Sequence, residues 1–209
     1  GNDTLVGGQG DDLYVADNSN DTIIEDSIAG SSGNDTVIAL GTSFNLNTNG
    51  ANVEQLYHRG IAAGVVGNYL ATAFTGIGNA LNNYIAGGTG NDSMSVGGTN
   101  SHIDAGGGND SVTDGGGSNT ILGGDGNDTF VFGNGAGGND TIDGSDGFNT
   151  LLANGTNLAD TITVGSALGA IVVKRGGATI TASANIEAVV VNGLGGNDTI
   201  TLNPNLPAH

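Results

Sequence analysis

The chain has 209 residues and a formal net charge of -18, with 41 glycines, two prolines and no cysteine. The lack of cysteine excludes disulfides and thiolate metal sites, and three basic residues against 21 acidic ones exclude a phosphate-binding surface for nucleic acid. Scarce proline and the absence of glycine at every third position exclude collagen, and no apolar run approaches the length of a transmembrane helix.

Residues 1–40 open with a short motif that returns along the chain. Gly-Asn-Asp stands at 1–3 and 33–35, Gly-Asp-Asp stands at 10–12, and an apolar residue follows each of these motifs by two positions. We interpret residues 1–3 as a repeat cut in mid-phase and therefore expect the chain to be part of a longer protein. The block is predicted to contain short strands separated by glycine-rich turns.

Residues 41–86 keep this spacing with a different composition. The segment is rich in asparagine and nearly free of acidic turns. Its apolar positions remain evenly spaced from the preceding block onward, at Val37, Leu46, Leu56, Val65, Phe74 and Ile85. We expect the strand-and-turn pattern to continue through this spacer, with stacked asparagine side chains in its turns.

Residues 87–152 carry the strictest repeat. Gly-Asn-Asp recurs at 90–92, 108–110, 126–128 and 138–140. The apolar residues that accompany it are nine positions apart: Ile85, Met94, Ile103, Val112, Ile121 and Phe130. We predict that this block binds metal, because its turns bring acidic residues together at regular intervals.

Residues 153–209 are less regular and contain few acidic turns before the closing Gly-Gly-Asn-Asp at 195–198. Runs such as Ala-Ile-Val-Val and Ala-Val-Val-Val predict strands, because β-branched residues favour them. Apolar residues again recur at short intervals, at Ile162, Val172, Ile180, Val190 and Ile200. We expect metal-poor coils of the same kind.

A repeat of nine residues has a direct geometric interpretation. Its glycine-rich part forms a tight turn, because glycine adopts positive φ at little cost. The remaining part forms a short strand whose middle side chain points inward. Two such units make one coil of a flattened solenoid, and stacked coils form two parallel sheets. The sequence therefore predicts one elongated all-β solenoid domain over 1–209.

Three segments carry the full nonapeptide. They are Gly-Gly-Gln-Gly-Asp-Asp-Leu-Tyr-Val at 7–15, Gly-Gly-Thr-Gly-Asn-Asp-Ser-Met-Ser at 87–95 and Gly-Gly-Asp-Gly-Asn-Asp-Thr-Phe-Val at 123–131. They resemble the calcium-binding repeats of the RTX (repeats-in-toxin) family. The resemblance implies a right-handed parallel β-roll in a large protein exported by a Gram-negative bacterium through type I secretion, and hence an extracellular or cell-surface location.

Stacked turns on one edge of such a solenoid are 18 residues apart. In the central block the sixth turn positions of one edge are Asp92, Asp110 and Asp128, and carboxylate and carbonyl oxygens are the ligands that calcium prefers. The sixth positions of the opposite edge are Ser101 and Asn119, which carry no charge. We therefore expect calcium on the first edge, with Asp110 shared by two ions, and little or none on the second.

The resemblance also implies which backbone carbonyls complete these sites. They belong to Gly88, Gly90, Ala105, Gly106, Gly107, Gly108, Gly123 and Asp125.

Candidate calcium ligands also lie outside the three full nonapeptides. Asp3 and Asp21 are 18 apart, whereas Asp12 faces the other edge and lacks a full partner. Isolated Gly-Asn-Asp copies, for which a solvated turn is the competing interpretation, add Asp35 and Asp198, and the copy at 138–140 adds Asp140. We expect roughly three to six calcium ions in total, and a largely unfolded metal-free chain because stacked carboxylates repel one another.

The leading functional interpretation is a non-enzymatic, calcium-folded segment of a secreted bacterial protein, with an adhesin or surface-layer protein favoured. Calcium is the expected partner; nucleic acid and a transmembrane segment are not expected, and open sheet ends would permit end-to-end self-association or contact with a cell surface.

Two other functions remain open. A β-helix polysaccharide-active enzyme would need clustered polar residues, and Tyr57-His58-Arg59 offers a cluster of this kind, although neighbours on a strand face opposite sides. A calcium-dependent ice-binding adhesin would need flat ladders of threonine and asparagine. The asparagine column is intact in the central turns, but the threonine column reads Thr89, Gly107, Asp125.

Overall fold

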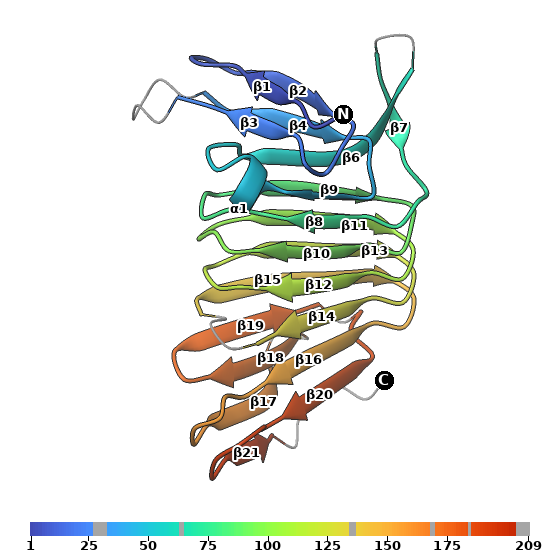
Figure 1. The fold of residues 1–209 in the computed structure, drawn as a ribbon. Coiled ribbons are helices and arrows are strands. Elements are labelled where there is room, and N and C mark those ends of the chain that lie inside the picture. Colours follow the sequence, from blue (N-terminus) through green and yellow to red (C-terminus); the bar gives the residue numbers. More distant parts are fainter. Residues whose placement is uncertain (27–32, 63–64, 134–136, 168–169, 184, 204–209) are drawn as a thin grey trace.

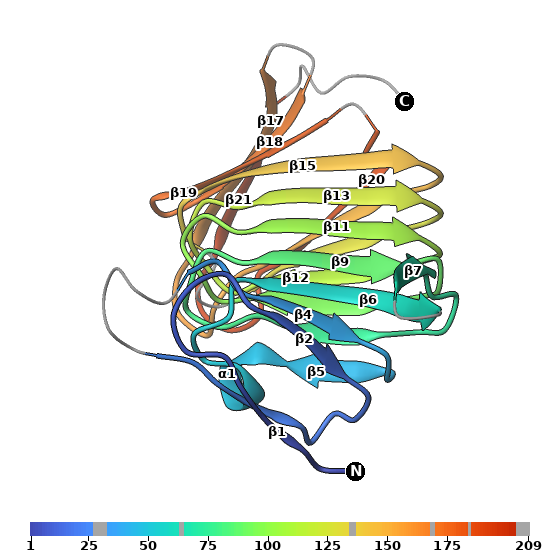
Figure 2. The same ribbon diagram turned by 90° about the horizontal axis from the view of Figure 1, so that it is seen from above.

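The computed structural model describes residues 1–26, 33–62, 65–133, 137–167, 170–183 and 185–203. Over this part of the chain, strands stack in coils from the N-terminal to the C-terminal end, and the chain passes alternately between two facing sheets (Figure 1). Seen from above, strands from successive coils follow one another in parallel rows (Figure 2). The predicted parallel β-roll is confirmed.

The larger sheet has twelve described strands and includes every second strand of the central coils. In order across the sheet it contains β2 (Leu13–Ala16), β4 (Thr36–Ala39), β6 (Gln55–Ala62), β9 (Tyr84–Gly88), β11 (His102–Gly107), β13 (Thr120–Asp125), β15 (Asn139–Asp146), β19 (Ala178–Ala182), β18 (Ala170–Arg175), β17 (Thr161–Ala167) and β21 (Thr199–Leu202), with β7 (Val65–Tyr69) paired to β6.

The facing sheet has seven described strands. Its order is β20 (Ala188–Asn192), β16 (Thr150–Asn154), β14 (Thr129–Phe132), β12 (Ser111–Asp114), β10 (Ser93–Val96), β8 (Thr75–Ile77) and β5 (Ser43–Asn45). At the N-terminal end β1 (Thr4–Val6) pairs with β3 (Thr22–Ile24), and the short helix α1 (Leu46–Asn49) follows β5.

The nine-residue period explains the core. Strands 18 residues apart pair in parallel, so that Met94 lies beside Val112 in one sheet and Ile103 lies beside Ile121 in the other. Because one coil contains two nonapeptides, successive apolar residues enter the same interior from opposite sheets. A single cluster of buried residues extends from Tyr14 to Ile186, and burial of this apolar surface is the main stabilising contribution.

Two segments depart from regular coils. The β17, β18 and β19 strands pair antiparallel, so the expectation of parallel coils is wrong there. The Gly176-Gly177 pair reverses the chain between β18 and β19, with Gly176 at φ 57°. In the spacer, β6 and β7 form an antiparallel hairpin, so Val65 belongs to that hairpin instead of a coil.

None of the helices in the described residues has the length and apolar character needed to cross a membrane.

Candidate metal centre

A ladder of hydrogen bonds runs along the first edge, which we define as the turns that lead from the twelve-stranded to the seven-stranded sheet. The backbone N–H of Phe74 donates to Oδ1 of Asp92 at 2.8 Å, Asp92 N–H donates to Asp110 Oδ1 at 2.7 Å, and Asp110 N–H donates to Asp128 Oδ1 at 2.9 Å. The ladder continues through Asn149. Each sixth-position side chain is thereby fixed against the preceding coil.

The second carboxylate oxygens of this ladder are poorly satisfied. Oδ2 of Asp110 and Oδ2 of Asp128 are buried without a hydrogen-bond partner, whereas Oδ2 of Asp92 accepts from Gly88 N–H at 2.8 Å. All three residues are at most 3% exposed. Burial raises the pKa of all three carboxyl groups, and that of Asp110 to about 7. A buried carboxylate in this state requires a proton or a cation.

Glycine keeps the turns of the first edge close together. A Cβ atom on Gly106 would overlap the carbonyl oxygen of Gly88, and one on Gly108 would overlap that of Gly90. A Cβ atom on Gly87 would overlap the carbonyl oxygen of Ala105. Oxygen atoms therefore crowd the space between adjacent turns, and an oxygen-only donor set suits calcium better than zinc.

The other expected carbonyl ligands lie in the same turns. Gly107 pairs in register with Asp125, whose carbonyl oxygen accepts from Gly108 N–H at 2.8 Å. A Cβ atom on Gly123 would overlap Oδ2 of Asp128. Their assignment as calcium ligands stays a prediction.

Close stacking predicts a sharp difference between two glycines of this edge. Gly124 has φ +103° and a Cβ atom there would overlap the Gly106 carbonyl, so Gly124→Ala should lower the free energy of unfolding by about 3 kcal/mol or more. Gly107 has ordinary φ and no neighbour closer than 3.8 Å to its Cβ position, so Gly107→Ala should change it by less than about 1 kcal/mol. Urea unfolding in millimolar calcium measures both, and equal losses would contradict the observed stacking.

The N-terminal acids form two clusters. Asp3 N–H donates to Asp21 Oδ1 at 2.9 Å, and these carboxylates gather with that of Asp17, with ligand atoms within 4.8 Å of one another. The amino group of Gly1 lies 3.7 Å from Asp17. Asp3 and Asp21 are thus brought together as their spacing predicted.

The second cluster corrects one prediction. Asp12 does have a stacked partner, because its N–H donates to Oδ1 of Asp35, 23 residues away, at 2.9 Å. Glu25 joins them, with the three carboxylates within 4.8 Å of one another. Asp35 is fully buried, and Oδ2 of both aspartates lacks a partner. Sequence reasoning missed this pair because the two aspartates are 23 residues apart instead of 18.

Asp140 and Asp198 also lie on the second edge, which comprises the turns leading from the seven-stranded to the twelve-stranded sheet. Asn119 N–H donates to Oδ1 of Asp140, 21 residues away, at 2.9 Å. Asp198 accepts from Asp160 N–H at 3.0 Å, so each of the two aspartates pairs with a neighbouring turn. The carboxylate of Asp160 is bound by Thr156, whose N–H lowers its pKa.

Sequence reasoning did not identify Glu25 and Asp114 as candidates. Both residues lie two positions after a buried core residue, Ile23 and Val112 respectively; Glu25 directly follows β3 and Asp114 ends β12. In the nonapeptide pattern that position is the first of the turn, and the Asp114 side chain there is buried. An acidic residue at the first turn position is the sequence signal that could have identified both residues.

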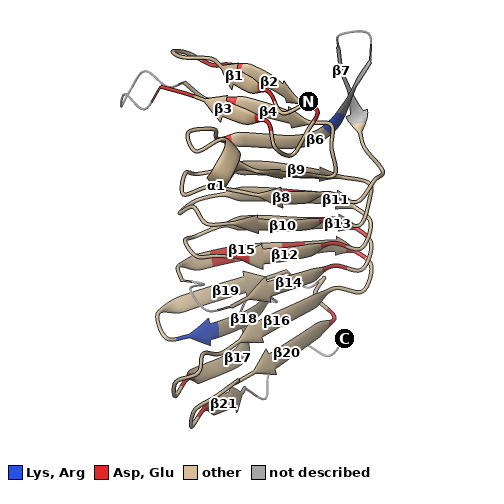
Figure 3. Ribbon diagram, in the orientation of Figure 1, with Lys and Arg blue, Asp and Glu red and all other residues tan. Residues whose placement is uncertain are grey.

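Figure 3 shows that acidic residues of the central coils occur along the ribbon where strands pass into turns. A model of the RTX calcium-binding nonapeptide repeat (4 copies) matches residues 1–23, 25–41, 77–112, 95–130, 104–138 and 134–166, which together span more than half of the chain. No curated protein and no solved structure matches the chain. The nine-residue repeat of the sequence, the parallel β-roll and the match to the family model all indicate the same family. The chain belongs to the RTX calcium-binding nonapeptide repeat family.

Proposed function

We propose that this β-roll is a non-enzymatic segment of a larger secreted or cell-surface bacterial protein, an adhesin or surface-layer protein, that folds when it binds calcium outside the cell. The observation that carries the proposal is the pair of unpartnered oxygens on Asp110 and Asp128 within a continuous ladder of sixth-position side chains. In this proposal Asp92, Asp110 and Asp128 hold calcium together with the crowded turn carbonyls. The bound ions supply the positive charge that the chain itself lacks.

The surroundings of Tyr57, His58 and Arg59 argue against the enzyme alternative. His58 is fully buried and its ring stacks on Phe74 with centroids 4.4 Å apart, while Tyr57 packs on Tyr84. The Arg59 guanidinium lies over the Tyr69 ring. Burial lowers the pKa of His58, which favours its neutral form. His58 therefore faces the interior, whereas Tyr57 and Arg59 lie near each other beside Tyr69 on the other side of the strand, so the three side chains do not form one cluster.

The asparagine column argues against ice binding. Asn109 N–H donates to Oδ1 of Asn91, and Asn127 N–H donates to Oδ1 of Asn109, at 2.8 and 2.7 Å. These side-chain oxygens already bond along the solenoid axis. The exposed Phe148 ends the column, because its N–H donates to Asn127 Oδ1.

Exposed apolar residues at both ends of the stack support end-to-end packing. Val6, Leu13 and Ile24 are exposed on the first strands, and Ile200 and Leu202 are exposed on β21. We include in the proposal that these ends pack against further coils, of the same protein or of a second copy.

Calcium titration by isothermal calorimetry tests the proposed function. The chain should bind several calcium ions, and the triple variant Asp92→Asn, Asp110→Asn, Asp128→Asn should bind fewer. Asp104→Asn is the matched control, because Asp104 lies on β11 between the buried Ile103 and Ala105 and faces outward. A wild-type chain that binds no calcium, or a triple variant that binds as much as wild type, would overturn the proposal.

A further inference from the structure

The second edge carries a buried carboxylate in a column of apolar side chains. Asp114 ends β12, and its register partners in the adjacent coils are Val96 and Phe132. All three side chains face the interior, and Asp114 is 2% exposed. An inward-facing charge at this position is costly unless something neutralises it.

Asn119 joins this carboxylate to a second one. Its side-chain Nδ2 donates to Oδ1 of Asp114 at 2.6 Å, and its backbone N–H donates to Oδ1 of Asp140 at 2.9 Å. Asp140 belongs to the next coil and is also 2% exposed. The two carboxylates therefore converge on Asn119 from successive turns.

Each carboxylate retains one oxygen without a partner. Oδ2 of Asp114 and Oδ2 of Asp140 are both buried and accept no hydrogen bond. Burial raises the pKa of Asp140 to about 7, and the nearby charge of Asp114 adds to this effect. The two unpartnered oxygens thus belong to side chains that both bond to Asn119.

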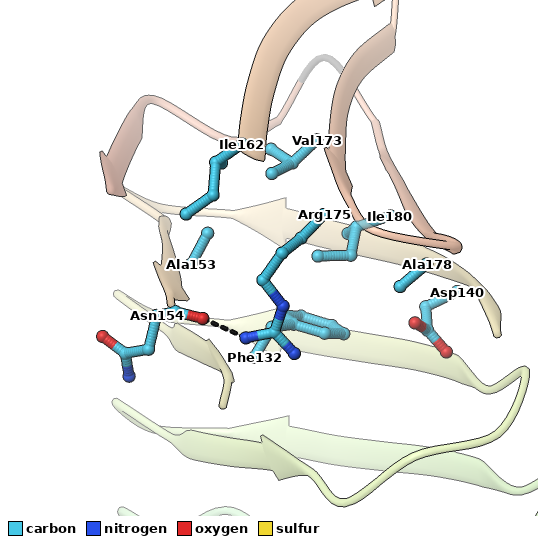
Figure 4. Close-up of a pocket in the computed structure, with 9 residues that line it drawn as sticks. All are labelled: Phe132, Asp140, Ala153, Asn154, Ile162, Val173, Arg175, Ala178 and Ile180. Atoms are coloured by element: carbon cyan, nitrogen blue, oxygen red, sulfur yellow. Dashed lines mark hydrogen bonds between the residues drawn. The ribbon is translucent and has the colours of Figure 1, made fainter. Parts of the chain in front are cut away.

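The basic side chain that shares a cavity with Asp140 donates hydrogen bonds to backbone carbonyls. Arg175 and Asp140 line the same cavity beside Phe132 (Figure 4). The guanidinium donates to the carbonyl oxygens of Asn154 and Gly133.

We propose that Asp114 and Asp140 bind a divalent cation of the calcium type on the second edge, at a site in which an inward-facing acid at the first turn position replaces the missing sixth-position aspartate. Two unpartnered carboxylate oxygens, with the amide of Asn119 between the two side chains, offer hard oxygen ligands. The cation would remove both the repulsion and the unsatisfied buried charge. This site is separate from the first-edge ladder and needs none of its residues.

The N-terminal coils contain a similar arrangement. Glu25 occupies the same turn position as Asp114, two residues after a buried core residue, and follows β3 of the two-stranded sheet before the chain enters the twelve-stranded sheet at β4. Its carboxylate gathers with those of Asp12 and Asp35, with ligand atoms within 4.8 Å of one another. An acid at the first turn position therefore meets sixth-position aspartates twice, each time before the chain enters the twelve-stranded sheet.

Native mass spectrometry in calcium, with calorimetry on the full chain, tests the proposal. Asp114→Asn should bind one calcium ion fewer than wild type, while Asp104→Asn should bind the same number. An unchanged calcium count in folded Asp114→Asn would overturn the site and indicate that the pair shares a proton instead. Asp110→Asn, measured in parallel, reports on the first edge alone. A wrong assignment of the first-edge site can therefore be distinguished from a wrong assignment of the Asp114–Asp140 site.

Asn119→Asp provides a second test in the opposite direction. A third carboxylate between Asp114 and Asp140 should strengthen calcium binding at this site by about tenfold, because affinity rises with the number of charged ligands. Without a cation the same change adds a third buried charge. A variant that loses stability in calcium, with no gain in affinity, would refute the proposal.

Discussion

Removal of calcium with EGTA at pH 8 is expected to unfold most of the chain. A site with Kd near ~0.1 mM contributes about 1.8 kcal/mol at ~2 mM calcium, and five such sites contribute about 9 kcal/mol. This sum is comparable to the whole net stability of an ordinary domain. The opposing electrostatic cost is large, since the buried carboxylates of Asp35, Asp110 and Asp140 then each lie beside another carboxylate, in three separate places, without a counter-ion.

Far-ultraviolet circular dichroism measures this transition. The spectrum should change from β structure in millimolar calcium to coil in EGTA, and should return when calcium is restored. Magnesium at the same concentration is the control, because it prefers a smaller octahedral shell and dehydrates reluctantly. A full β spectrum in EGTA would show that apolar burial alone maintains the fold.

The central coils could be predicted from the sequence because one simple constraint fixes them. Residues nine apart, such as Ile103 and Val112, must enter one interior from two sheets, and the glycine-rich turns between them permit close stacking. The column of Asp92, Asp110 and Asp128 follows from the same period. The nine-residue period therefore predicts both the register of the strands and the column of aspartates on the first edge.

The nine-residue period did not predict the structure correctly where the number of residues between strands differs from that of a nonapeptide turn. An antiparallel meander and a stack of parallel coils can show similar intervals between apolar residues. The spacing therefore does not distinguish the antiparallel strands β17 to β19 from parallel coils. Three extra residues increase the spacing between Asn119 and Asp140 to 21, which hid their pairing on the second edge. Inward-facing acids such as Asp114 were missed because a nonapeptide pattern expects glycine at that turn position.

Asp110→Asn is expected to have opposite effects with and without calcium. The asparagine Oδ1 can still accept from Asp92 N–H, as Asn149 accepts from Asp128 N–H in the same column. In calcium the variant loses charge from two ions at about 1.8 kcal/mol each, and should be about 4 kcal/mol less stable. In EGTA it removes a buried, unpartnered carboxylate oxygen and should be about 1–3 kcal/mol more stable than wild type.

The pKa of Asp110 determines how the stability difference in EGTA depends on pH. The pKa of Asp110 is raised from 3.8 to about 7 in the metal-free fold, chiefly by burial. The folded chain therefore binds more protons than the unfolded chain between these values, and the carboxyl group's contribution to stability is lost as pH rises through about 7. The advantage of the variant in EGTA should be largest at pH 8 and should shrink as pH falls toward 5.

Urea unfolding at pH 8 and pH 5.5 measures these differences, with enough trimethylamine oxide in the EGTA samples to keep both proteins folded. Asp104→Asn should change stability little under every condition, because its carboxylate faces outward from β11. If Asp110→Asn lost stability in EGTA as well as in calcium, the carboxylate would be stabilising without a metal. If it lost none in calcium, no ion would depend on Asp110, and the first edge would have to be assigned to a different set of ligands.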